Sequence, residues 1–129
     1  MSNEAKTVQL TLAEESGVRF VEGPQGLQLM RTIKDASLVV EACFSNRVKS
    51  ALLYASNLTG GFFDLSSGEA GAILQKLRTY KIRIAVVYAP ERVRFSSRFG
   101  EMVAEESRGH HFRLFESVQA AREWLSRNP

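Results

Sequence analysis

Apolar and polar residues alternate with period two near the start of the chain. Valine and leucine alternate with polar residues over 8–12, and the alternation resumes over 18–20 after a polar turn at 15–17. Because successive side chains of a strand point to opposite faces, this pattern predicts a β-hairpin. The segment 22–30 carries two glycines and a proline among weakly alternating apolar residues, which predicts a loop with a short extended end.

Further along, the apolar spacing switches between helical and extended. Thr32 with Asp35 is a variant of the N-terminal capping box, and apolar residues recur at helical spacing from there to about Asn46. The apolar run 51–55 predicts a strand buried on both faces. The other predicted elements are a helix over about 67–80, a strand over 82–89, a helix with Phe95, Phe99, Met102 and Val103 on one face and a left-handed cap at Gly109, a strand over 112–115, and a helix capped by Ser117.

The predicted order of elements is therefore β-β-α-β-α-β-α-β-α. Strands that alternate with helices return parallel to one another through right-handed crossovers, so this order predicts an α/β fold. We expect a mixed, mostly parallel five-stranded sheet with helices packed on it, in which the N-terminal hairpin is the antiparallel pair. No repeat, low-complexity tract or linker divides the chain, and its 129 residues fit a single domain over 1–129.

Composition and charge narrow the classes of function. The net charge of +3 arises from 17 basic and 14 acidic residues spread along the chain without a run of about five like charges, which argues against a nucleic-acid-binding protein. No window approaches the ~18 apolar residues of a membrane span, and charges interrupt the N-terminal stretch where a signal peptide would be apolar. The single cysteine, Cys43, fits a small core residue in a reducing compartment. We expect a cytoplasmic protein that binds neither nucleic acid nor membranes.

The stretch NLTGGFFDLSSGEAGAILQK, residues 57–76, holds the most distinctive motif. Ser66 and Glu69 match the Ser-x-x-Glu capping box, in which the serine oxygen accepts from an early helical N–H and the glutamate accepts from the N–H of the cap. Phe62 and Phe63 precede it, where one of them can pack on the first apolar turn of the helix. A well-capped helix after a strand thus accounts for most of the motif without a functional role.

Few residues have the spacing of catalytic or metal-binding groups. His110 and His111 are adjacent, so on a strand they point to opposite faces, and no Cys, Asp or Glu lies at ligand spacing around them. Asp64 has no second acid or histidine close in sequence to form a catalytic pair. Gly60-Gly61 is followed by neither of the glycine-rich phosphate-binding motifs. We therefore predict no catalytic residue, no cofactor and no metal, and a protein that is not an enzyme.

The segment 92–99 combines arginines with aromatic residues and serines. It can hold an anion or another small ligand, with Ser97 at a helix start, or it can be a basic, solvated face over buried Phe95 and Phe99. This segment and the Ser66-Ser67-Gly68 turn each follow a strand of the predicted parallel sheet. Because the carboxyl ends of parallel strands lie at one edge, we expect any functional surface there.

The order Phe63-Asp64-Leu65-Ser66-Ser67-Gly68 resembles the turn of the anti-sigma-factor-antagonist domains, known as STAS domains. In that family a strand is followed by an apolar residue, Asp-Ser-Ser-Gly and an apolar helix, and one serine of the pair is the target of a partner kinase. This chain has one extra residue, Leu65, between the aspartate and the serines, and Glu69 where the family usually has an apolar residue. The resemblance implies a STAS-like fold over nearly the whole chain and phosphorylation at Ser66 or Ser67.

A resemblance that is more specific in sequence is to an uncharacterised bacterial family, domain of unknown function 4180. It covers most of the chain and implies no function, and the family often has threonine, another hydroxyl, at the position of Ser67. The residues that carry it are Asn57-Leu58-Thr59, Phe62-Phe63-Asp64-Leu65, Gly68, Ala70-Gly71, Ile73-Leu74-Gln75-Lys76, Ser97, Glu106-Ser107, Gly109 and Trp124-Leu125.

Two hypotheses of function remain open. The first is a non-enzymatic regulatory or protein-interaction module that meets a kinase or an anti-sigma-like regulator and is switched by phosphorylation of Ser67 or Ser66. The alternative is a small-molecule or anion-binding domain, or a degenerate enzyme, with Asp64, Thr59, Arg94 and Ser97 converging at the sheet edge. A pocket of about a few hundred cubic ångströms lined by these four residues favours the alternative, and a flat loop favours the module. The expected partner or ligand surface comprises Asn57, Thr59, Phe62, Phe63, Asp64, Glu69, Arg94 and Ser97.

Overall fold

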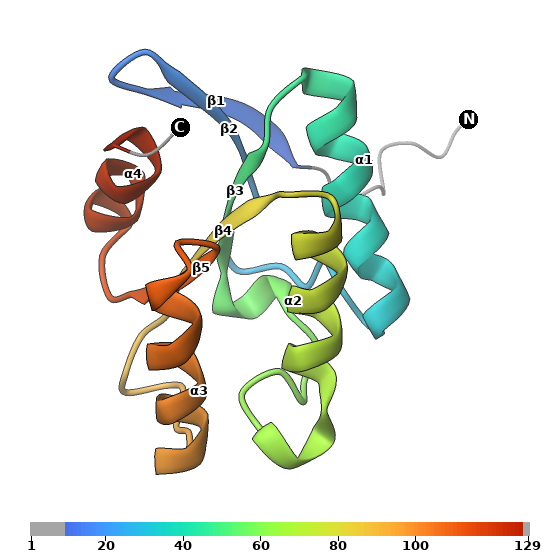
Figure 1. Ribbon diagram of the computed structural model, residues 1–129, viewed down its shortest axis with the longest axis vertical. Helices are drawn as coiled ribbons and strands as arrows, with labels where there is room; N and C mark the ends of the chain where they lie inside the picture. Colours follow the sequence, from blue (N-terminus) through green and yellow to red (C-terminus); the bar gives the residue numbers. More distant parts are fainter. Residues whose placement is uncertain (1–9, 128–129) are drawn as a thin grey trace.

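The computed structural model describes residues 10–127 as a five-stranded sheet with helices packed on it (Figure 1). The strands lie in the order β1-β2-β3-β4-β5; β1 and β2 pair antiparallel, and the other neighbours pair parallel. This is the predicted α/β fold with a mixed sheet. The strands are β1 (Thr11–Glu15), β2 (Val18–Glu22), β3 (Ser50–Tyr54), β4 (Arg83–Val87) and β5 (Phe112–Phe115), and the helices are α1 (Ala36–Asn46), α2 (Glu69–Thr79), α3 (Ser97–Arg108) and α4 (Val118–Arg127).

The helices form two layers, one on each face of the sheet. Successive right-handed crossovers between neighbouring strands carry α1, α2 and α3 to the same face, whereas α4 follows the last strand and is free to cross to the other. Alternate residues of each strand face the two layers; Leu53 and Ile84 pack with α1 and α2, whereas Leu52 and Ala85 pack with α4. Every residue of β3 is buried, which explains the uninterrupted apolar run that predicted it.

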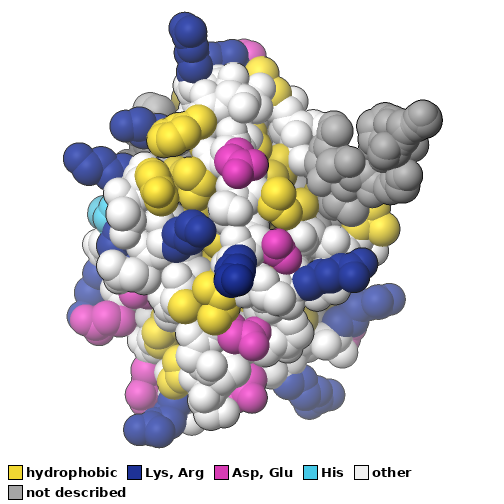
Figure 2. Space-filling model, turned by 90° about the vertical axis from the view of Figure 1, so that its right-hand side faces the viewer, with side chains coloured by type: hydrophobic (Ala, Val, Ile, Leu, Met, Phe, Trp, Pro, Cys, Tyr) yellow, Lys and Arg dark blue, Asp and Glu magenta, His cyan; other side chains and the backbone are white. Residues whose placement is uncertain are grey.

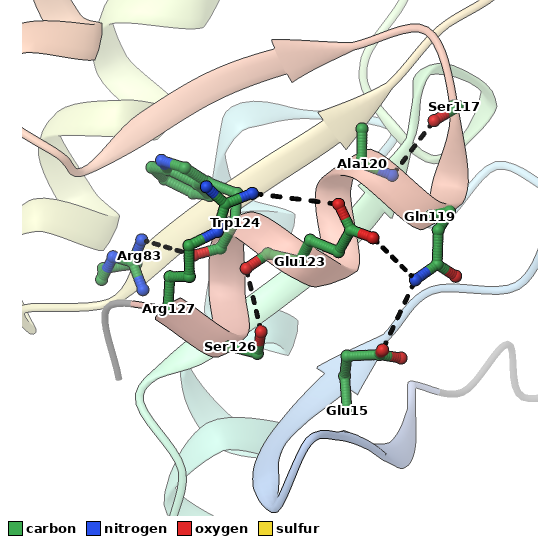
Figure 3. Close-up of polar contacts among 9 residues, drawn as sticks. All are labelled: Glu15, Arg83, Ser117, Gln119, Ala120, Glu123, Trp124, Ser126 and Arg127. Carbon is green, nitrogen blue, oxygen red and sulfur yellow. Dashed lines mark hydrogen bonds and ion pairs between the residues drawn. The ribbon is translucent and has the colours of Figure 1, made fainter.

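Three buried residues of α4, Ala121, Trp124 and Leu125, close the second face, and polar contacts hold the helix in place (Figure 3). The Ser117 hydroxyl accepts from the backbone N–H of Ala120 at 3.0 Å, as the predicted cap requires. The ring of Trp124 is 7% exposed, and the Arg83 guanidinium lies over it at 4.1 Å from the ring centre. Arg83 also donates to the Trp124 carbonyl at 3.4 Å, so a β4 side chain fixes the last turn of the helix.

Most predicted local features are present, with shifted boundaries. The hairpin turns at 16–17, and residues 8 and 9 of the predicted first strand lie outside the described residues. The Asp35 carboxylate accepts from the N–H of Thr32 at 3.2 Å, and a 3-10 turn, η2 (Ile33–Asp35), leads into α1. The backbone bonds from Arg31 and Thr32 lower the pKa of Asp35.

The predicted left-handed cap at Gly109 is wrong. Gly109 has φ of −84° and is right-handed, and the next residue, His110, takes the left-handed conformation with φ of +63°. The short extended end predicted for 22–30 forms no strand in the structure either. Its residues Leu29 and Met30 instead donate their N–H groups to one carbonyl, that of Asn57, at 3.0 and 2.7 Å.

The outer side of α1 and α2 carries scattered apolar side chains. Phe44 is 66% exposed and Tyr80 42%, and their rings meet edge to face at 5.9 Å. In the view onto this side, apolar side chains occur in small groups between charged ones rather than as one continuous patch (Figure 2). Within residues 10–127, no helix has the length and apolarity that a membrane span requires.

Asn57 fixes the chain where β3 ends. Its Oδ1 accepts from the N–H of Tyr54 at 2.8 Å, and its Nδ2 donates to the carbonyls of Pro24 and Leu27 at 2.6 and 2.8 Å. The side chain is 0% exposed, so these bonds are made away from water. Gly23 leaves it room, because a Cβ there would lie 2.2 Å from Asn57 Oδ1. This amide therefore ties the 22–30 loop to the sheet.

We predict that Asn57→Ala lowers the free energy of unfolding by about 3 kcal/mol, since it leaves a buried N–H and two carbonyls unpaired. Asn46→Ala is the matched control, because the Asn46 amide is half-buried and donates to a single carbonyl, that of Ala42, at 2.8 Å. Asn46→Ala should lower the free energy of unfolding by less than about 1 kcal/mol. Urea denaturation followed by circular dichroism measures both, and equal losses would contradict the role given to Asn57.

Two glycines should respond to alanine with opposite signs. Gly71 lies exposed inside α2 with nothing within 4 Å of an added Cβ, so Gly71→Ala should stabilise the protein by about 0.5–1 kcal/mol. Gly23→Ala should destabilise it by about 2 kcal/mol or more, because the new methyl group meets Asn57 Oδ1. Thermal unfolding of the two variants side by side tests this, and a Gly23→Ala variant as stable as the wild type would show that the amide can move aside.

Candidate functional site

Two segments meet at the carboxyl edge of the sheet, as the sequence predicted. Residues 55–68 follow β3 and residues 88–96 follow β4, and both lie at the lower end of the molecule in Figure 1. The ring of Phe63 from the first segment stacks on that of Phe95 from the second, with centres 6.3 Å apart and planes 19° apart. An aromatic contact therefore holds the two segments together.

The Ser66-Ser67-Gly68 turn is closed by three side chains. Asp64 Oδ1 accepts from the N–H of Ser66 at 3.1 Å and from its hydroxyl at 2.6 Å, and so caps a 3-10 turn, η4 (Leu65–Ser67). The Ser67 hydroxyl donates to the Gly61 carbonyl at 2.7 Å and accepts from the N–H of Glu69 at 3.1 Å. A single serine thus joins the start of the loop to the first turn of α2.

The predicted capping box of Ser66 and Glu69 is wrong. Glu69 Oε1 accepts from the N–H of Gly61 at 3.1 Å instead of that of Ser66. The reason is local: Gly68 is left-handed, with φ of +76°, and delays the start of α2 until Glu69. Two side chains therefore hold Gly61, Glu69 at its N–H and Ser67 at its carbonyl, which also accepts from the N–H of Asp64 at 3.0 Å.

The structure divides the expected partner or ligand surface into buried and exposed residues. Asn57 and Phe62 are 0% exposed, so these two side chains do not form part of a surface. Phe62 packs in the core against Phe99 and Phe112, with ring centres 6.2 and 6.1 Å apart. Thr59 is buried, Phe63 and Glu69 are half-buried, and Asp64, Ser66, Ser67, Arg94 and Ser97 are exposed.

The four residues of the ligand hypothesis do not converge. Asp64 and Arg94 line a shallow hollow of about 330 Å³, in which Phe63 and Phe95 form part of the wall. Thr59 and Ser97 are outside this hollow. Ser96 rather than Ser97 caps α3, its hydroxyl accepting from the N–H of Phe99 at 3.2 Å, so Ser97 already belongs to the helix.

A larger cleft, of about 870 Å³, opens beside this hollow and was not predicted. One wall comes from the end of β3 and the residues after it, and the other from the end of β4 and the loop after it. Its lining includes Tyr54, Leu58, Thr59, Phe63, Tyr88, Val93 and Glu116. Tyr54 ends β3 and Tyr88 follows β4 directly, so the only sequence signal was a tyrosine at the end of each strand.

Both tyrosines of the cleft remain protonated at neutral pH. Burial and the hydrogen bond that Tyr54 donates to Glu22 at 2.8 Å raise the pKa of Tyr54 to about 12. Burial, with the charge of Glu116 nearby, also raises the pKa of Tyr88. These phenols can donate hydrogen bonds, but they are poor bases.

One polar atom in the cleft wall is unpaired. Thr59 is 5% exposed, and its Oγ1 is buried without a hydrogen-bond partner, although its carbonyl accepts from the N–H of Phe62 at 3.1 Å.

Outside the cleft, burial raises the pKa of the Cys43 thiol to about 12, which disfavours the reactive thiolate. Among residues 10–127, no three His, Cys, Asp or Glu side chains gather as metal ligands would.

Comparison with known proteins identifies the family but not the chemistry. The model of the family described as a domain of unknown function matches residues 15–125, which is nearly the whole chain. No curated protein and no solved structure matched. The match includes both segments of the carboxyl edge and all of the strands except the first four residues of β1. The chain therefore belongs to the family known as domain of unknown function DUF4180.

Proposed function

We propose that the chain is a non-enzymatic, STAS-like regulatory module that binds another protein through the turn at 60–68 and is switched by phosphorylation of Ser67. One observation carries this proposal: the Ser67 hydroxyl is exposed, yet it is the group that joins the Gly61 carbonyl to the first N–H of α2. The resemblance of this turn to that of the STAS domains supports it. We place the module in the cytoplasm, where a kinase would find ATP.

Ser67 suits a switch better than its neighbour. A phosphate on Ser66 would stand beside the Asp64 carboxylate, which the Ser66 hydroxyl now contacts at 2.6 Å. A phosphate on Ser67 would instead stand before α2, where free N–H groups and the helix dipole stabilise negative charge by roughly 0.3–1 kcal/mol. The helix would therefore survive the modification.

Phosphorylation of Ser67 would open the turn at 60–68. Phosphorylation removes the proton that Ser67 donates to the Gly61 carbonyl. The new charge also repels the carboxylate of Glu69, which holds the N–H of the same glycine. Both bonds to Gly61 are then weakened together, so one modification loosens the loop while the helix behind it stays folded.

The surface around the turn suits a protein partner. Half-buried Phe63 and Leu65 lie between the exposed charges of Asp64 and Arg94 around the shallow hollow. An apolar side chain of a partner can enter this hollow while polar groups meet the two charges at its rim. Opening of the turn would move Asp64 and Leu65, and with them half of this surface.

We predict that Ser67→Asp lowers the affinity for the native partner by about tenfold or more, whereas Ser67→Ala, which loses the bond to the Gly61 carbonyl but leaves Glu69 unrepelled on the Gly61 N–H, lowers it by about threefold. The test is affinity capture from the host followed by mass spectrometry of the bound proteins and of the bait. Ser45→Asp is the matched control, because Ser45 is exposed on α1 away from the turn. Phosphate on Ser67 of the native protein is expected; an unmodified bait whose partners are the same in all variants would refute the switch.

A second prediction concerns the turn alone. Ser67→Asp should speed amide hydrogen exchange of Gly61 and Asp64 by about tenfold, because the carbonyl and N–H of Gly61 lose their partners. Exchange of Leu52 in the centre of β3 should not change. Exchange measured by nuclear magnetic resonance resolves these residues. Unchanged rates at Gly61 would mean that a negative charge on residue 67 leaves the turn closed.

A further inference from the structure

We propose that the cleft at the ends of β3 and β4 binds a planar aromatic amine. This site is separate from the Ser67 switch, since Ser66 and Ser67 do not line it. Its volume, about 870 Å³, lies within the range of about 300–1,000 Å³ that is usual for small-molecule sites. It also opens at the carboxyl edge of the parallel strands, where open α/β sheets hold their ligands.

The unpaired hydroxyl of Thr59 points to a ligand. A buried hydroxyl without a partner is costly, and most such groups in folded proteins are paired. Neighbouring polar side chains are used: Ser56 Oγ accepts from the N–H of Gly26 at 3.2 Å, and the Asn57 amide makes three bonds. Thr59 thus has unused hydrogen-bonding capacity beside the cleft, and a rotation of its side chain would present the hydroxyl to a polar group of a ligand.

Aromatic residues determine the shape of that ligand. Phe63 and Tyr88 line the cleft. The ring of Phe95 contacts both, with its centre 6.3 Å from that of Phe63 and 5.9 Å from that of Tyr88. Phe63 cannot turn freely, because it also packs on Phe62 and Phe99 at 5.1 and 5.5 Å. Aromatic side chains on both walls of the cleft favour a flat ring that can stack or meet the rings edge to face.

The charges of the cleft select an amine. The charged side chains of its lining are Glu91, Arg92 and Glu116. The lining therefore has one more carboxylate than guanidinium, and the Glu116 carboxylate lies 3.5 Å from the Tyr88 hydroxyl. An ammonium group can meet this carboxylate and the face of Tyr88 together, whereas an anion would be repelled.

Two probes that share the indole ring but carry opposite charges, tryptamine and indole-3-acetate, test the inference. Each is titrated into the full chain while amide resonances are recorded. Saturable shifts are expected for tryptamine at Thr59, Gly60, Tyr88 and Ala89, with an affinity about tenfold higher than that of indole-3-acetate. Glu116→Gln should remove most of this preference. No saturable shift with either probe, shifts elsewhere, or tighter binding of indole-3-acetate would overturn the proposal.

Thr59→Val separates a ligand contact from a structural role. Because Thr59 Oγ1 has no partner in the structure, the valine variant should unfold at the same or a higher urea concentration, yet bind tryptamine about three- to tenfold more weakly. Thr79→Val is the control, since Thr79 is exposed at the end of α2, where its hydroxyl donates to the Gln75 carbonyl. A valine variant that binds tryptamine like the wild type would overturn the role of Thr59. The outcome is independent of Ser67, so failure of this site leaves the switch to its own test.

Discussion

The buried amide of Asn57 is the interaction on which the functional end of the molecule depends. It satisfies the last N–H of β3 and two carbonyls of the 22–30 loop, while the backbone carbonyl of Asn57 accepts from the N–H groups of Leu29 and Met30 in that loop. A buried polar group that is fully paired specifies one arrangement of the backbone, because each displaced partner costs a desolvated group. The chain therefore leaves β3 in a fixed direction, and the segment that begins two residues later starts from a fixed point.

That segment, 59–67, serves both proposed sites. Thr59 stands in the wall of the cleft, Phe62 is anchored in the core, and Ser67 closes the turn. Short backbone bonds connect them, from the N–H of Phe62 to the Thr59 carbonyl and from the N–H of Asp64 to the Gly61 carbonyl. The two proposed sites thus use the two ends of one segment, Thr59 for the cleft and Ser67 for the turn.

The order of the elements could be predicted from the sequence because each depends on local signals. The period-two hairpin, the apolar run of β3 and the Ser117 cap need no knowledge of the rest of the chain, and the common edge of the two segments follows from topology. The site was predicted less well because its details depend on distant contacts. Asn57 bonds to residues about thirty positions earlier in the chain, so its role could not be inferred from its neighbours. Ser66 and Glu69 have the spacing of a capping box. The Glu69 carboxylate nevertheless accepts from the N–H of Gly61, eight positions earlier in the chain.

A chain of hydrogen bonds connects the cleft with α4. Tyr54, one wall of the cleft, donates to Glu22, and Glu22 in turn accepts from Arg122 of α4 at 2.8 Å. The helix that covers the same face of the sheet as Tyr54, α4, thus fixes a residue of the cleft through a chain of charge-assisted hydrogen bonds. The same bond and burial hold Tyr54 protonated up to about pH 12, so its hydroxyl remains a donor committed to Glu22. Aromatic side chains line the cleft and burial raises the pKa of both phenols, which is the arrangement that the proposed aromatic ligand requires.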